Sequence, residues 1–182
     1  DNYVLRTNLA VFRDQVRVSD RLGDQLQGEM SCRLMTLTFT GTNEFQKMVA
    51  EDNVLITRED NQFEAARAEY TGSNNLLDLT GNPGWRAGPR SGKGDWVRVN
   101  LAHEEMLVRG HAFMALPATE LGQSAFTGSG AGNRRESKGG TNTLARIFSG
   151  QYLVAPEQAL FQGGVRIEHP QMKWTCDELT LL

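Results

Sequence analysis

The sequence predicts an all-β protein, an elongated and twisted β-jelly roll of stacked short antiparallel strands. Apolar and polar residues alternate over short segments, which indicates strands with one buried face. Gly, Asn and Asp residues that favour turns separate these segments. Two strand patterns also recur along the chain, and such repeats stack because a single repeat cannot bury its own apolar face.

The first recurrence joins the two ends of the sequence. FRDQVRV and then MSCRLMTL, within residues 12–37, match FQGGVRI and then WTCDELTL, within residues 161–181. The aligned pairs include Phe12 and Phe161, Val16 and Val165, and Cys32 and Cys176. The two ends are therefore expected to form equivalent strand pairs.

One pattern within these copies begins with an apolar residue and has a small residue two positions later. Two further apolar residues follow at alternate positions, but the first of them comes three positions after the small residue instead of two, so the pattern contains one extra residue. The extra residue predicts a β-bulge that returns the next apolar side chain to the inner face. The copies, one of which has Gly in place of the first apolar residue, are Met30-Cys32-Met35-Leu37, Phe63-Ala65-Ala68-Tyr70, Gly92-Gly94-Val97-Val99, a weaker Ile147-Ser149-Tyr152-Val154, and Trp174-Cys176-Leu179-Leu181.

The other pattern places Gly or Asp two residues after an apolar residue and just before a further strand segment. Gly, Asn and Asp tolerate the left-handed backbone of a turn or bulge. The copies are Phe12-x-Asp14-Gln15-Val16, Ala50-x-Asp52-Asn53-Val54, Leu79-x-Gly81-Asn82-Pro83, Val108-x-Gly110-His111-Ala112 and Phe161-x-Gly163-Gly164-Val165.

Two segments need separate treatment. Helix-forming residues dominate Asp60–Tyr70, yet the match of this segment to the bulged pattern predicts a strand. Residues 117–142 contain GSGAGNRRESKGGTN, and this composition predicts a mobile surface loop inserted into the array. Because the repeat resumes after it, residues 1–182 are expected to form a single domain.

Composition excludes several classes of protein. With 182 residues, 39% hydrophobic and 23% charged, the chain is long and apolar enough for a core without disulfide support. A net charge of −3 lacks the excess of positive charge that is typical of proteins that bind nucleic acid. No apolar run approaches the ~20 residues that span a bilayer. No secretory leader opens the sequence at Asp1, as in a mature or trimmed chain or a cytoplasmic protein.

Catalytic and metal-binding motifs are not found in the sequence, so we expect no enzyme and no cofactor. GxSxG is absent, and Gly88–Asp95 (GPRSGKGD) lacks the order of a P-loop and is interpreted as a hairpin turn. Cys32 and Cys176 stand outside any CxxC, and the histidines show no metal-ligand spacing to them. Both cysteines are expected to be buried thiols, and a disulfide between them is the alternative.

Residues 50–112 resemble the lipopolysaccharide-transport jelly-roll family, whose OstA-like fold is shared by LptA, LptC and the periplasmic part of LptD. Through the internal repeat, the resemblance extends to residues 3–39 and 152–181. The motifs that carry it, in order, are Asn53-Val54, Ala65-x-x-Ala68-x-Tyr70, Leu79-Thr80-Gly81-Asn82-Pro83, Gly94-Asp95 and Val108-x-Gly110-x-Ala112. The inserted loop, and an ending within a strand at Leu179–Leu182, depart from the family pattern. This ending suggests that the chain continues or pairs with another subunit.

The resemblance implies a periplasmic protein of a Gram-negative envelope that holds lipid A acyl chains in an apolar groove and transports lipopolysaccharide as a bridge or scaffold. It would be peripheral to membranes, and would join itself or related jelly rolls by edge-strand pairing. The alternative is a structural or assembly module with a closed, dry core that binds no lipid.

The candidate groove follows from the inward-facing apolar positions of the two patterns. Methionines suit a wall that adapts to variable acyl chains, and basic side chains at the rim suit lipid A phosphates. The groove residues are Phe12, Val16, Met30, Met35, Leu37, Val54, Ile56, Phe63, Tyr70, Val97, Val99, Phe161 and Val165, with Val18 and Ile167 also facing inward. The rim residues are Arg58, Arg67 and Lys93.

Overall fold

A computed structural model describes residues 3–6, 8–41, 44–121, 143–169 and 172–182. The described residues form an all-β fold with one short 3-10 helix. The elements are β1 (Tyr3–Arg6), β2 (Leu9–Leu22), β3 (Gln25–Phe39), β4 (Phe45–Arg58), β5 (Asn61–Thr71), β6 (Leu76–Thr80), β7 (Gly84–Ala87), β8 (Arg90–Lys93), β9 (Trp96–Asn100), β10 (Glu105–Pro117), η1 (Ala118–Leu121), β11 (Leu144–Ala155), β12 (Gln158–His169) and β13 (Met172–Leu181).

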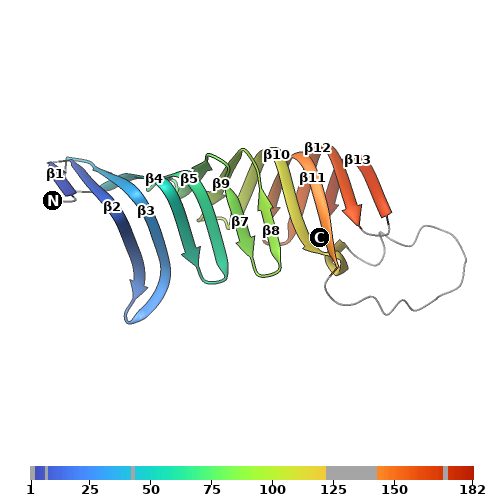
Figure 1. Cartoon of the computed structure of the whole chain (residues 1–182), viewed down its shortest axis with the longest axis horizontal. Helices are drawn as coiled ribbons and strands as arrows, with labels where there is room; N and C mark the ends of the chain where they lie inside the picture. Colours follow the sequence, from blue (N-terminus) through green and yellow to red (C-terminus); the bar gives the residue numbers. More distant parts are fainter. Residues whose placement is uncertain (1–2, 7, 42–43, 122–142, 170–171) are drawn as a thin grey trace, which may run out of the picture.

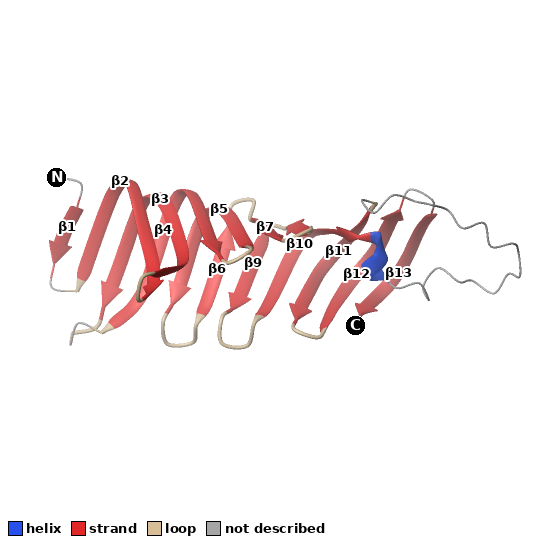
Figure 2. Cartoon of the chain, turned by 90° about the horizontal axis from the view of Figure 1, so that it is seen from below, coloured by secondary structure: helices blue, strands red, loops and turns tan. Residues whose placement is uncertain are grey.

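All the strands belong to one antiparallel sheet that runs along the length of the molecule. Its order is β1-β2-β3-β4-β5-β6-β9-β10-β11-β12-β13, while β7 pairs with β5 and β8, and β8 pairs with β10. Neighbours in sequence are therefore neighbours in space, and the chain advances from β1 at one end to β13 at the other (Figures 1 and 2). The predicted elongated β-jelly-roll-like fold is confirmed.

The strands bend at five pairs of consecutive residues with left-handed backbone. These pairs coincide with the five copies of the Gly/Asp pattern, so the prediction of left-handed residues there is confirmed. Only Gly, Asn and Asp adopt positive φ readily, which explains their frequency at these positions. The pairs, with their φ angles, are Asp14–Gln15 (62° and 53°), Asp52–Asn53 (62° and 57°), Gly81–Asn82 (75° and 58°), Gly110–His111 (72° and 44°) and Gly163–Gly164 (84° and 67°).

Each bend is a bulge in the hydrogen-bonded ladder. Arg13 pairs with Leu34 and Val16 pairs with Cys32, so the two left-handed residues of β2 face the single residue Arg33 of β3. The same register shift occurs between β4 and β5, β10 and β11, and β12 and β13. The predicted bulge is thus present at this level, but its two extra residues belong to the Gly/Asp pattern, and the single residue that faces them follows the small residue of the first pattern.

The bends divide the sheet into two walls. We call wall A the strands and strand segments on one side of the bends, which form a continuous ladder from β1 through β6 and β9 to the end of β13. We call wall B the strands and strand segments on the other side of the bends, which form a second ladder from residues 16–22 of β2 through β7 and β8 to residues 172–176 of β13. In the third repeat the bend breaks both strands completely, so that one gives β6 in wall A and β7 in wall B, and the other gives β8 in wall B and β9 in wall A.

The predicted inner face carries the core. Met35, Val54, Val97, Phe161 and Val165 are all no more than 2% exposed. They belong to one apolar cluster that extends over both walls. The strand predicted over 60–70, against its helical propensity, is confirmed as β5, because Ala68 and Tyr70 pair with the neighbouring strands on the inner face.

Two inner-face predictions are wrong, and both concern the ends of the array. Val18 is 41% exposed, because β1 pairs only with Leu9–Phe12 and leaves the wall B part of β2 as an edge. Cys176 is exposed, because no described strand lies beyond β13, whereas Cys32 is buried. Both thiols are free, so the alternative of a disulfide between them is also wrong.

The hairpin turn predicted over Gly88–Asp95 is confirmed only at its start. Gly88 has a φ of 54° in the tight turn between β7 and β8, whereas Arg90–Lys93 form β8 and Gly94 and Asp95 lie between β8 and β9. Of the loop expected over 117–142, Pro117 ends β10 and Ala118–Leu121 form η1, while 122–142 lie outside the described residues.

The bend geometry predicts that Gly81→Ala destabilises the protein more than Gly164→Ala. A Cβ at Gly81 would lie 2.5 Å from the Cβ of Ala66, whereas nothing lies within 4 Å of a Cβ at Gly164. Both changes place Ala at positive φ, which costs about 1–2 kcal/mol, and overpacking at Gly81 adds about 1–3 kcal/mol. Urea unfolding of the two variants measures the difference, and equal losses would contradict the proposed close approach at Gly81.

Candidate functional site

The inner faces of the two walls form an apolar trough whose floor lies at the level of the bends. Along the middle of the array, most side chains on either side of the bends are almost completely excluded from solvent. At this level the walls meet and pack as an ordinary protein core does. The floor residues with no more than 2% exposure are Met35, Ala50, Val54, Ala68, Leu79, Val97, Val108, Ala112, Tyr152, Phe161 and Val165.

Farther from the bends, many inward-facing side chains become accessible to solvent. On β3, for example, Met35 near the bend is buried whereas Leu37 is only partly buried. The walls therefore diverge from the floor toward a mouth in part of the array, whereas Leu116, Ala145 and Ile147 of wall B are as buried as the floor residues. The partly buried apolar residues at the mouth level are Leu37, Met48, Ile56, Phe63, Tyr70, Ala87, Val99, Met106, Val154, Ala159 and Leu181.

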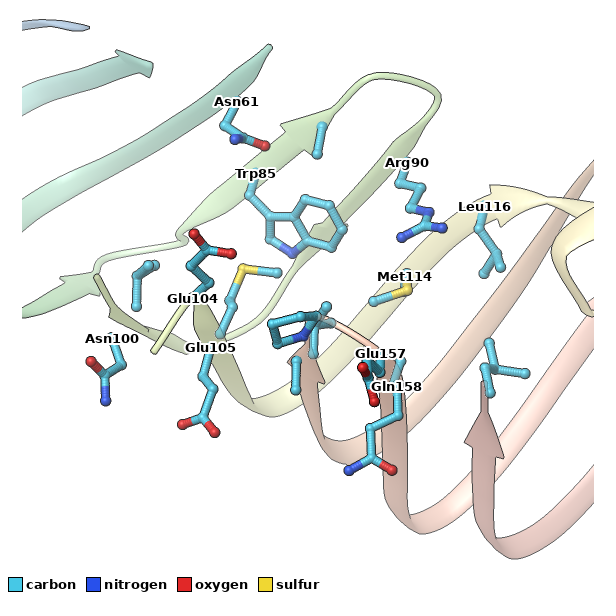
Figure 3. A pocket seen from close by; sticks show the side chains of 18 of the residues that line it. Asn61, Trp85, Arg90, Asn100, Glu104, Glu105, Met114, Leu116, Glu157 and Gln158 are labelled. Carbon is cyan, nitrogen blue, oxygen red and sulfur yellow. The ribbon is translucent and has the colours of Figure 1, made fainter. Parts of the chain in front are cut away.

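A cleft of about 660 Å³ lies at this mouth, between the ends of the two walls (Figure 3). Wall B contributes Phe63, Trp85 and Met114, and wall A contributes Val99 and Met106. Apolar residues from both walls thus line one cleft, and its size lies within the range of ligand pockets.

The structure places all thirteen predicted groove residues in the apolar cluster of the trough or packed against it. Met30, Met35, Val54, Val97, Phe161 and Val165 are buried in its floor and lower walls. Phe12, Val16, Leu37, Ile56, Phe63, Tyr70 and Val99 are partly buried. Of the thirteen, Phe63 and Val99 line the cleft itself.

The three predicted basic rim residues do not lie together. Arg58 lines the cleft. Arg67 lies on the outer face, where its guanidinium donates to Glu51 at 2.6 Å and to Glu69 at 3.1 Å. Lys93 also lies outside the trough, with its Nζ 6.0 Å from the centre of the Phe113 ring. The prediction of a rim position is wrong for Arg67 and Lys93, because strand alternation turns both side chains away from the trough.

Carboxylates outnumber basic groups at the mouth. The described residues that line the cleft include five glutamates and two arginines. Arg90 is already paired, since its Nε lies 2.7 Å from Glu120 Oε2. The glutamates are Glu59, Glu104, Glu105, Glu120 and Glu157. The expected concentration of positive charge around the groove is therefore absent from this part of the described chain.

The outer face of wall A is instead organised by polar pairs between neighbouring strands. Arg98 makes a two-pronged contact with Asp78 at 2.8 and 2.9 Å, and Asp78 raises the pKa of Arg98. A hydrogen bond from Lys47 lowers the pKa of Glu69. These side chains are solvent-accessible, so each pair contributes at most about 1 kcal/mol.

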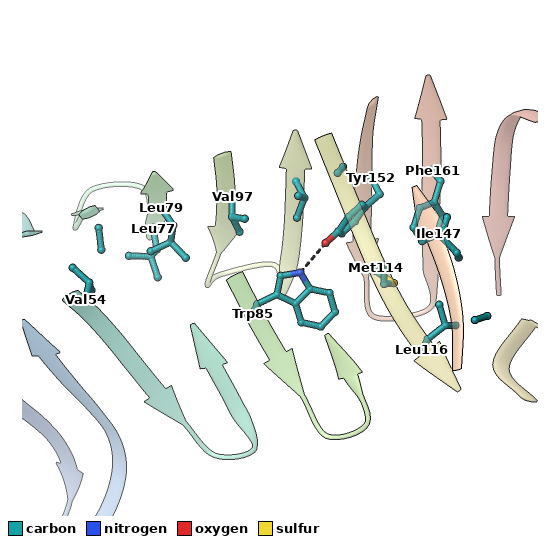
Figure 4. Close-up of a cluster of buried hydrophobic side chains, with 14 of the residues drawn as sticks. Val54, Leu77, Leu79, Trp85, Val97, Met114, Leu116, Ile147, Tyr152 and Phe161 are labelled. Atoms are coloured by element: carbon teal, nitrogen blue, oxygen red, sulfur yellow. Dashed lines mark hydrogen bonds between the residues drawn. The ribbon is translucent and has the colours of Figure 1, made fainter. Parts of the chain in front are cut away.

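A hydrogen-bonded pair connects the two walls below the cleft. Trp85 of wall B donates from Nε1 to the hydroxyl of Tyr152 of wall A at 2.7 Å. The Tyr152 hydroxyl in turn donates to the carbonyl of Phe113 in wall B at 3.3 Å. Figure 4 shows the pair within the buried apolar cluster. Burial raises the pKa of Tyr152 well above its ordinary value, so the hydroxyl remains a donor.

Sequence reasoning missed Trp85 and Met114 as trough residues, although a signal for both was available. Pro83 and Ala112 are the residues that directly follow a bend, and Trp85 and Met114 stand two positions after them. Ile56 and Ile167 occupy the same position in other repeats, and all four side chains belong to the apolar cluster or pack against it. Extending the Gly/Asp pattern by two residues would have identified them.

Among the described residues, no group of three or more His, Cys, Asp or Glu side chains is placed to hold a metal ion. None of the helices in that part of the chain is long and apolar enough to cross a membrane. His111 Nδ1 lies 2.9 Å from Asp95 Oδ2, but this pair is exposed at a bend and outside the cleft.

Comparison with known proteins leaves the chain unassigned. No protein-family model matches it, and a search of the curated proteins finds no match either.

Replacing Tyr152 by Phe tests the connection between the walls. The change leaves the buried indole N–H of Trp85 without its acceptor, so the free energy of unfolding should fall by about 1–3 kcal/mol. Tyr70→Phe is the control, because the Tyr70 hydroxyl donates to Asn75 at an exposed site and its loss should cost about 0.5 kcal/mol or less. Equal effects in denaturant unfolding would show that the buried pair adds no stability.

The raised pKa of Tyr152 also predicts a pH dependence. Above a pH of about 10 the tyrosine of the unfolded chain ionises, whereas Tyr152 in the folded protein stays neutral. The unfolded state then binds fewer protons than the folded state, so the free energy of unfolding falls as pH rises. The difference in unfolding free energy between the wild type and Tyr152→Phe should therefore shrink between about pH 9 and about pH 11. Above the pKa of the unfolded tyrosine it should shrink by up to about 1.4 kcal/mol per pH unit. Unfolding free energies over this range measure it, and a constant difference would refute it.

Proposed function

We propose that this chain binds lipopolysaccharide and transports it across the periplasm as a bridge or scaffold component, with the acyl chains held in the apolar trough. The observation that carries the proposal is the gradient of burial within the trough. The floor is closed, whereas Phe63, Val99 and Met106, from both walls, are partly accessible at the mouth around the cleft. A closed, dry core would bury these side chains as completely as the floor residues.

The energetics of acyl chains suit such a trough. Each methylene taken out of water contributes about 0.8 kcal/mol, so a few partly sheltered chains give firm but reversible binding. Met106 and Met114 line the cleft, and methionine adapts its shape to irregular apolar ligands. Binding therefore depends mainly on the tails, which agrees with the small number of basic groups at the mouth.

The two ends of the sheet support a role as a bridge. Among the described strands, β13 pairs only with β12, and residues 16–22 of β2 pair only with β3. Unpaired strand edges favour pairing with another chain. At the β2 end, Leu22 and Leu26 are 75% and 52% exposed. We propose that these edges join a second copy or a related jelly roll, which would extend the trough.

Site-specific photo-crosslinking tests lipid binding. Benzoylphenylalanine in place of Phe63, which faces the cleft, should crosslink to purified lipid A. The same probe in place of Glu64 is the matched control, because this adjacent residue is exposed on the outer face. Mass spectrometry of the products measures lipid attachment at each position.

Labelling at position 63 well above that at position 64 is the expected result. Equal labelling at both positions would indicate non-specific contact with lipid and would refute binding in the trough. No labelling at either position would favour a structural module that associates through its strand edges without lipid.

A further inference from the structure

The lower boundary of the cleft differs from the rest of the trough. Trp85 lines the cleft and is only 7% exposed, and Tyr152, to which it is hydrogen-bonded, is completely buried. The indole therefore lies between the cleft and the buried Tyr152; Figure 3 shows it among the residues that line the cleft, and Figure 4 shows its hydrogen bond to Tyr152. A ligand in the cleft meets this side chain before it reaches the bends.

The backbone around the indole is adapted to hold it there. Gly92 pairs with Trp85 on one side and with Met114 on the other. A Cβ on Gly92 would lie 2.5 Å from Trp85 Nε1 and 2.7 Å from the Phe113 carbonyl oxygen, and would also overlap the Tyr152 hydroxyl. The absence of a side chain at Gly92 thus provides the space in which the hydrogen-bonded pair lies.

Equivalent positions in the other repeats have no such connection. The residues in register with Trp85 are Val18, Ile56, Met114 and Ile167, and their apolar side chains have no hydrogen-bonding group. Trp85 is thus the largest of the five, and it is fixed at its polar end by Tyr152. An aliphatic side chain or methionine can move to admit a ligand, whereas a hydrogen-bonded indole held between two walls is rigid.

We propose that Trp85 limits how deeply an apolar tail enters the cleft, and thereby determines the preferred tail length of the ligand. The inference rests on the proposed lipid-holding function and adds a specificity-determining residue to it. Tyr152 and Gly92 act as positioning residues, since they fix the indole and lie beside it. Methylenes beyond the length that reaches Trp85 remain in water and add no affinity.

A series of detergents with one uncharged head group tests this limit. Isothermal titration calorimetry of octyl to hexadecyl maltosides, each below its critical micelle concentration, gives affinity as a function of tail length. For the wild type, binding should tighten about fourfold per methylene until the tail reaches Trp85, and then remain constant. The uncharged head group removes any influence of the glutamates at the mouth.

Trp85→Leu shortens the barrier and keeps the position apolar, so the fourfold gain per methylene should continue to longer tails before it levels off. Trp96→Leu is the matched control, because Trp96 stacks with Arg98 and Arg109 on the outer face, 4.8 and 5.6 Å from their guanidinium carbons. If Trp85→Leu does not fold, Trp85→Phe serves as the second variant, with a smaller extension in the same direction.

A folded variant at position 85 whose affinity levels off at the wild-type tail length would overturn the inference, while lipid binding itself would stand. The same shift in Trp96→Leu would also overturn it, because a general loosening of the fold would then be the cause. If the wild type binds no maltoside of any length, both the inference and the proposed lipid binding fail.

Discussion

The paired left-handed residues at the bends are the constraint on which the rest of the structure depends. At four of the five bends two residues of one strand face a single residue of its neighbour, so adjacent strands turn at the same level and the ladder resumes on the other side. Because every repeat bends in step, two continuous walls form instead of one flat sheet. A flat sheet with the same sequence would expose its apolar face to water, whereas two walls that meet at the bends cover each other.

The same constraint determines which side chains lie beside the bends. The backbones approach closely there, and the inner positions hold the small residues Cys32, Ala65, Gly94 and Ser149. The Ser149 hydroxyl is buried and has no hydrogen-bond partner among the described residues, which indicates that small size matters more at this position than polarity. Away from the bends the requirement is relaxed, and larger apolar side chains line diverging walls. In the middle of the array, the contact of Trp85 with Tyr152 fixes their separation.

Charge is distributed so that the trough itself remains apolar. Ion pairs and hydrogen-bonded side chains follow the outer face of wall A from Lys47 on β4 to Glu178 on β13. These exposed pairs add little stability, but they provide partners for the charged side chains on the outer face of a long sheet. The mouth carries more carboxylates than guanidinium groups. On the proposed function, a ligand would be held mainly by its apolar tails, with Arg58 as the single predicted rim residue that reaches the cleft.

The sequence by itself determined the all-β class, the positions of the five bends and the inward direction of the thirteen groove residues. These features repeat, and they follow from strand alternation and from the few residue types that accept positive φ. Only the tertiary structure decided which inward residues are exposed. Val18 and Cys176 follow the pattern but lie on edge strands, and Arg67 and Lys93 turn outward to partners on neighbouring strands. The pairing of Trp85 with Tyr152 joins residues 67 positions apart across two walls, so it depends on how far apart the walls lie, which no local pattern specifies.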